Sequence, residues 1–190
     1  MKAKLLFINL MTTYLLGFSS ISAQGFQPPS KGNAVIYFVR VSSMGNPMNF
    51  QYFHQDKYIG EFKGKNYMRY ECNPGEQLLW ASSENKEFMT ADFREGETYI
   101  VIVDVIIGVW KAHVGLRPIS VGNNEIFEKA KKLILQEPPM ITPEAKIEKM
   151  NLKLKDFIAA QLKMYDEKWK NERNFKNLSA DMAIPADAMK

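Results

Sequence analysis

The sequence predicts a mainly β fold, an antiparallel β-sandwich followed by two amphipathic helices. From residue 34 to residue 110, residues rich in Val, Ile, Tyr and Phe alternate with polar ones or form short apolar runs, as strands do. Turn residues interrupt this stretch about every eight to twelve residues, a spacing typical of a sandwich or barrel. After residue 120 the apolar residues recur at helical spacing instead.

The first 23 residues have the three-part layout of a secretory signal peptide. Two lysines precede an apolar run from Leu5 to Leu16, and small residues follow it up to Ala23. The run is about a dozen residues long, shorter than the roughly 20 that a transmembrane helix needs. This argues against an N-terminal anchor helix. We expect cleavage after Ala23, an exported mature chain with no transmembrane span, and a linker over residues 24–33.

The one cysteine, Cys72, lies deep in the mature part of the chain. A bacterial lipoprotein needs a cysteine directly after the apolar run, so we expect a periplasmic or extracellular protein that is not a lipoprotein. A single cysteine forms no internal disulfide. The residues around Cys72 alternate as a strand and include no basic cluster, which favours a small core residue over a reactive thiol.

The charge of the chain argues against a nucleic-acid partner. Loss of the first 23 residues removes two lysines and no acids, which lowers the formal net charge from +4 to +2. This charge is too small and too evenly spread for binding to nucleic acid. With about 165 residues left, one domain with an appendage can build a core without a metal or a disulfide.

The β-sandwich is expected to span residues 34–120 and to fold without the helices, because its turn and strand signals agree with each other. The segment 67–72 is expected to form a second hairpin, and Pro74 and Gly75 suit a type II turn after it. The most continuous β run, residues 98–107, is placed centrally in its sheet. The other expected strands are 34–41, 50–54 paired with 58–62, 77–82, 88–93 and 109–118.

Two helices and a tail are expected after the sandwich. A short helix over residues 123–136 carries apolar residues on one face and ends before Pro138-Pro139. Thr142-Pro143-Glu144 is typical of a helix start and opens a long helix over residues 142–173. Residues 174–190 show no periodicity and are expected to be disordered.

The long helix carries the candidate interaction surface. Its apolar stripe continues for about six turns at 3.6 residues per turn, whereas the face of a sandwich offers about 25 Å of support. Part of the stripe should then contact an envelope protein or a second copy of the chain. The alternative is that the long helix folds back on the short one and hides both stripes. The residues proposed for contact are Leu154, Phe157, Leu162, Tyr165 and Trp169.

No pattern in the sequence indicates a catalytic, cofactor or metal site. His54 and His113 each stand alone in a strand without further ligands at metal-binding spacing. Asp104 lies in an apolar run, where an exposed or edge position is favoured over an active-site acid. Some aromatic residues could form a carbohydrate platform, although core packing is the favoured interpretation. They are Tyr52, Phe53, Tyr67, Tyr70, Trp80 and Trp110.

Three segments of the sandwich resemble a known family. They are 34–40, the pair 56–61 and 73–78, and 95–101. Together they are similar to the exported bacterial Domain of Unknown Function 2846 family and, more loosely, to PEGA-type surface domains. The resemblance covers about residues 34–120 and implies an immunoglobulin-like sandwich in an envelope or secreted protein, with no established activity.

Two hypotheses of function remain. The favoured one is a non-enzymatic binding or structural module of the bacterial envelope. The alternative is a small hydrolase or glycan-binding accessory protein with Asp104 or His113 in a pocket. An enzyme requires polar groups that converge in a cleft, whereas a binding module requires an exposed apolar patch.

Overall fold

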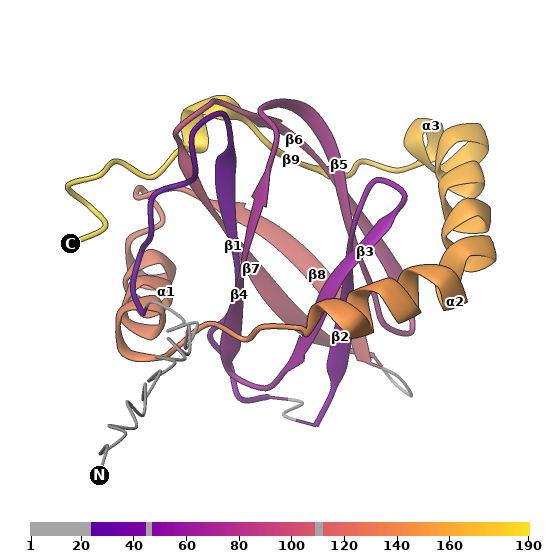
Figure 1. The fold of residues 1–190 in the computed structure, drawn as a ribbon, viewed down its shortest axis with the longest axis horizontal. Helices are drawn as coiled ribbons and strands as arrows, with labels where there is room; N and C mark the ends of the chain where they lie inside the picture. The colour runs from indigo at the N-terminus through magenta and orange to yellow at the C-terminus, as the bar shows by residue number, and fades with distance from the viewer. Residues whose placement is uncertain (1–23, 45–46, 109–111) are drawn as a thin grey trace, which may run out of the picture.

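Two β-sheets packed face to face lie between helices in the computed structural model, which describes residues 24–44, 47–108 and 112–190. Figure 1 shows α1 (Asn124–Gln136) and α2 (Glu144–Met164) on opposite sides of the sheets. The predicted β-sandwich followed by helices is confirmed. The predicted signal peptide, residues 1–23, lies outside the described residues.

The first sheet has four strands in the order β4-β1-β7-β8, and the second has five in the order β3-β2-β5-β6-β9. The strands of the first sheet are β1 (Ala34–Arg40), β4 (Asn66–Cys72), β7 (Thr98–Ile107) and β8 (Ala112–Ile119). Those of the second are β2 (Asn49–His54), β3 (Lys57–Lys63), β5 (Gly75–Ser82), β6 (Lys86–Phe93) and β9 (Lys176–Leu178).

The strand pairing differs from the prediction in two ways. Segments β2–β3, β5–β6 and β7–β8 form antiparallel hairpins, but β1 with β7 and β6 with β9 pair in parallel. The predicted second hairpin is absent, because β4 pairs with β1 of the first sheet while β3 and β5 belong to the second. The turn before β5 matches the prediction in that Gly75 has a positive φ of 91°.

Three apolar layers explain why some strands are apolar on both faces. The sandwich core lies between the sheets and includes Phe38, Leu79 and Val101. A second layer lies between the first sheet and α1, where Tyr37 and Ile100 meet Ile134. All seven residues of β1 are buried because this central strand contributes to both layers, as buried strands of covered sheets do.

The third layer lies between the second sheet and α2. Trp80 stacks on Phe53 with ring centroids 3.8 Å apart and on Phe88 at 5.2 Å. Phe88 in turn stacks on Tyr165 of the helical segment at 4.8 Å. Ile158 of α2 is buried against this aromatic cluster. Residues 34–120 were expected to need nothing from the helices, yet the outer faces of both sheets bury large side chains against them.

The long helical segment runs from Glu144 to Glu172, close to the predicted extent. It passes from α2 through a π-helical turn, η1 (Tyr165–Trp169), into α3 (Lys170–Glu172). Thr142 does not cap it, because the N-cap is Pro143 and the Thr142 hydroxyl contacts β3. Across the described parts of the chain, each helix is too short or too polar to cross a membrane.

The prediction of a disordered tail at residues 174–190 is wrong. Residues Lys176–Leu178 form β9, whose Leu178 is fully buried in the sandwich core. The Ile184 amide donates to the Thr98 carbonyl at 2.8 Å, and its side chain is buried beside α1. A few buried contacts of this kind leave no periodic pattern in the sequence. The expected linker 24–33 is also bonded to the rest of the protein: the Gly25 amide donates to the Ile134 carbonyl of α1 at 3.0 Å.

Candidate functional site

A groove of about 840 Å³ lies where the edge strands of the two sheets, β3 and β4, face each other. Its walls come from these strands, from the connection between α1 and α2, from the first turns of α2, and from Gln27 of the segment before β1. The lining side chains are mostly apolar, with charged residues at the rim. They include Lys57, Ile59, Met68, Tyr70, Met140, Ile141, Glu144, Ile147, Glu148 and Asn151.

Close packing between β3 and β4 occurs beside the groove, at Gly60. A Cβ atom on Gly60 would lie 2.7 Å from the Met68 sulfur and 2.9 Å from the Thr142 hydroxyl oxygen. Gly60 also has a φ of 152°, which side chains disfavour. The strand β3 has an irregular register with β2 at this point. Glycine at this position therefore permits Met68 and Thr142 to approach the backbone of β3 closely.

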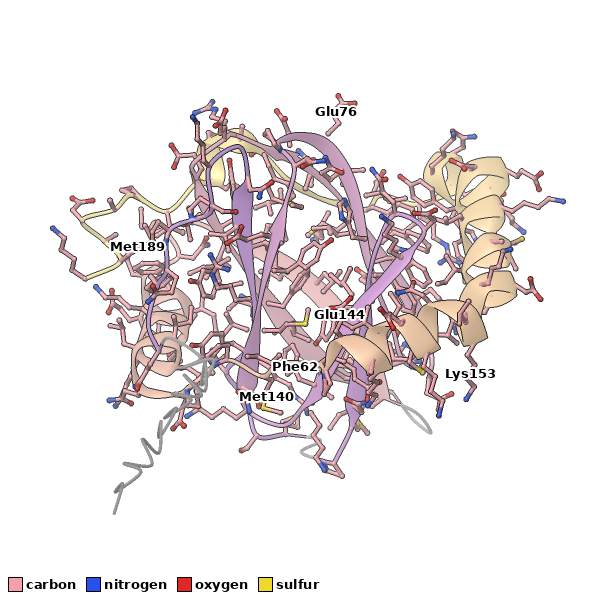
Figure 2. All side chains as sticks on the ribbon, in the orientation of Figure 1. Phe62, Glu76, Met140, Glu144, Lys153 and Met189 are labelled. Atoms are coloured by element: carbon pink, nitrogen blue, oxygen red, sulfur yellow. The ribbon has the colours of Figure 1, made fainter. Side chains whose placement is uncertain are left out.

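The connection between α1 and α2 crosses from one sheet to the other beside the groove. The Met140 amide donates to the Tyr67 carbonyl of β4 at 2.8 Å, and the Thr142 hydroxyl accepts from the Glu61 amide of β3 at 3.0 Å. Figure 2 labels Met140 in this crossing and Glu144 at the start of α2. Met140 and Ile141 remain 40% and 64% exposed, so apolar side chains at this wall face solvent.

The outer edge of β3 is covered by polar side chains of the helical region. The Asn151 amide pairs with the Tyr58 backbone in both directions, accepting from its N–H at 2.9 Å and donating to its carbonyl at 3.0 Å. The Thr142 hydroxyl likewise accepts from the Glu61 N–H at 3.0 Å and donates to the Glu61 carbonyl at 3.4 Å. These side chains replace a neighbouring strand, which is one way proteins protect a sheet edge.

The charges at the rim are separated by sign. Glu144 and Glu148 lie one turn apart on α2 and are exposed, and Lys57 lies at the start of β3. No ion pair to any of the three occurs among the described residues. Outside the groove on β3, burial tends to raise the pKa of Glu61, but hydrogen bonds from Lys146 and other groups outweigh it and lower that pKa.

A polar hollow of about 540 Å³ continues the groove along β4, and both are lined by Lys57 and Tyr70. His54 lies in it between the Tyr70 hydroxyl at 2.9 Å and the Gln77 side-chain oxygen at 2.7 Å. The Gln77 amide nitrogen donates to the Asn73 carbonyl, so its oxygen must accept from His54 Nε2. The other ring nitrogen of His54, Nδ1, lies 2.9 Å from the Tyr70 hydroxyl, and the two contacts together hold all three side chains.

The predicted interaction stripe of the long helix packs against the outer face of the second sheet. Its residues contact the third apolar layer and are partly buried there rather than exposed. The stripe does not meet α1 either, because α1 covers the other sheet. The expected stripe without a partner is therefore wrong: these residues cover the second sheet. The residues concerned are Leu154, Phe157, Leu162, Tyr165 and Trp169.

The other candidate residues do not converge. Asp104 forms a two-bond ion pair with Arg117 across β7 and β8, at 2.8 and 2.9 Å, and this pair raises the pKa of Arg117. His113 is exposed on β8, and neither it nor Asp104 lines the groove. Cys72 is buried, and burial together with the Glu71 charge raises the pKa of its thiol to about 12.

The aromatic residues mostly pack in the interior, as the favoured interpretation expects. Tyr52, Phe53, Tyr67 and Trp80 are buried, and Tyr70 is partly buried beside His54. Trp110 lies outside the described residues. The five described side chains therefore do not share one exposed face that could serve as a carbohydrate platform.

Sequence reasoning missed the groove because its walls come from segments far apart in the chain. One signal was present: Asn151 interrupts the apolar stripe between Ile147 and Leu154. A polar residue on the covered face of a helix needs a hydrogen-bond partner, and here that partner is a strand edge.

A scan of protein-family models finds none that matches the chain, and a search of curated proteins also finds no match.

Proposed function

We propose that this chain is an exported, non-enzymatic binding module of the bacterial envelope, and that it holds its partner in the groove between β3 and β4. The observation that carries the proposal is the groove itself: a concave surface of about 840 Å³ with exposed apolar side chains at its wall. Binding sites in proteins are typically concave and mostly apolar, with a few placed polar groups.

The proposal of export rests on the layout of residues 1–23 and on the resemblance of residues 34–120 to the Domain of Unknown Function 2846 family. The enzyme alternative gains no support from Asp104, whose carboxylate is held by Arg117 on the sheet surface. A general acid or base needs access to a substrate in a cleft. We therefore favour binding over hydrolysis.

Two measurements test the proposal. Mass spectrometry of the envelope and secreted fractions should find a mature chain that begins at Gln24, and a chain that keeps its first 23 residues would contradict export. A photo-crosslinking amino acid at Ile141, in the groove wall, should give a discrete adduct in living cells. The same amino acid at Leu152, exposed on α2 outside the groove, is the control. Equal labelling at both positions would contradict binding in the groove.

A further inference from the structure

We propose that the groove binds an extended peptide segment of another protein, which adds as a fifth strand to the free edge of β4. This inference rests on the proposed binding function and specifies the chemistry of the partner. Its evidence is the difference between the two sheet edges that line the groove.

The edge of β4 is open over part of its length. The Tyr67 amide and carbonyl point away from β1, since they bond to the Asn66 side chain and to the Met140 amide. Alternate residues of a strand direct their backbone groups to the same side, so those of Arg69 and Glu71 also point outward. Within the described residues, no hydrogen bond is made by the backbone amide or carbonyl of Arg69 or of Glu71.

The edge of β3 is closed in contrast, because Asn151 and Thr142 occupy its outward groups. An added strand therefore has one available partner in the groove, β4. The groove and the polar hollow together follow β4 from Met68 to Cys72. Five residues of an extended chain span about 17 Å at roughly 3.3 Å per residue, so a peptide of this length matches the open edge.

Side chains of such a peptide would meet two kinds of surface. Those on the inner side face Met68, Ile59 and Ile147, which favours apolar residues at alternate positions. Glu144 and Glu148 are exposed without an ion-pair partner among the described residues and form the acidic rim of the groove at α2. This favours a Lys or Arg at the end of the peptide that lies beside α2.

The test begins with a phage-displayed library of random seven-residue peptides selected on the mature protein. The enriched peptide, labelled with fluorescein, is measured by fluorescence anisotropy. Single N-methylation of its backbone amides should weaken binding about tenfold or more at alternate positions and little at the positions between, because only every second amide of an added strand faces β4. Enriched sequences should alternate apolar residues and carry a terminal Lys or Arg.

Protein variants place the peptide in the groove. Replacing Glu144→Lys together with Glu148→Lys should weaken binding about tenfold. The control, Glu128→Lys with Glu172→Lys, makes the same change of charge at exposed residues outside the groove and should leave affinity within about twofold.

Three outcomes would overturn strand addition. The first is a selected peptide whose affinity does not follow alternate N-methylation, and the second is the absence of any enriched peptide that competes with the Ile141 crosslink. The third is a dimer in light scattering together with an Ile141 adduct that is a second copy of the chain. In each of these cases a discrete Ile141 adduct in cells would leave the binding function standing, whereas loss of that adduct would remove the binding function as well.

Discussion

Asn151 joins α2 to the backbone of β3 by two hydrogen bonds. Its amide accepts from the Tyr58 N–H and donates to the Tyr58 carbonyl, and Tyr58 itself is buried. Replacing Asn151→Ala removes both bonds to Tyr58, each of which contributes about 0.5–1.5 kcal/mol net. It also removes a bond from the Asn151 amide nitrogen to the Ile147 carbonyl at 3.0 Å, which adds little because it lies within one helix. Alanine regains up to about 0.7 kcal/mol through its higher helix propensity. We therefore expect a loss of about 1–2 kcal/mol in the free energy of unfolding.

Urea denaturation of the mature chain measures this loss, and in a thermal melt it corresponds to roughly 2–8 °C for a protein of this size. Hydrogen exchange gives an independent measurement, because the Tyr58 amide should exchange faster in Asn151→Ala. The matched control is Asn177→Ala, where an exposed side chain loses one bond from Thr90 and stability should change by less than about 0.5 kcal/mol. An Asn151→Ala protein as stable as the control, with a Tyr58 amide still protected, would refute the reasoning.

Four further results are expected. Ile158→Ala should cost about 2–5 kcal/mol with unchanged molar mass in light scattering, whereas the exposed Leu152→Ala should cost little; a dimer that dissociates in Ile158→Ala would argue for a helix interface instead. The Cys72 thiol, with its pKa raised to about 12, should react with a thiol reagent at neutral pH only in urea, and reaction of the native protein would contradict its burial. Burial opposes the lowered pKa of Glu71, but hydrogen bonds from Ser30 and Arg69 prevail, so this carboxylate stabilises the fold above its ordinary pKa of 4.5. The stability difference between Glu71→Gln and the unchanged protein should be present at pH 7 and disappear as the pH falls below 4.5; a difference that is constant with pH would contradict this. A fragment of residues 34–120 should show no cooperative thermal transition, since it exposes the outer faces of both sheets, and a sharp melt would show that the helices are dispensable.

Local patterns in the sequence were sufficient for the elements. Alternation of apolar residues identified β1 to β8, and helical spacing identified α1 and the long helical segment within a few residues of their ends. Cys72 was assigned to the core from its neighbours alone. These features depend on contacts along one element, which periodicity reports directly.

The pairing of the strands was not available from the sequence. The parallel pair of β1 with β7 and the placement of β4 in the first sheet depend on how distant segments meet, and a period of two is the same for either partner. The tail shows the same limit: β9 is three residues long, too short for a pattern, and is ordered by β6 and by burial of Leu178.

The sequence by itself therefore determined a β-sandwich with two helices, because amphipathic elements must bury one face. Only the tertiary structure decided that α1 and α2 cover opposite sheets, and hence that the apolar stripe of the long helix is partly buried against the second sheet. The tertiary structure also determines the groove. Asn151 and Thr142 occupy the edge of β3, while β4 stays open beside it. These contacts join residues about 80 to 90 positions apart in the chain, so no local sequence pattern predicts them.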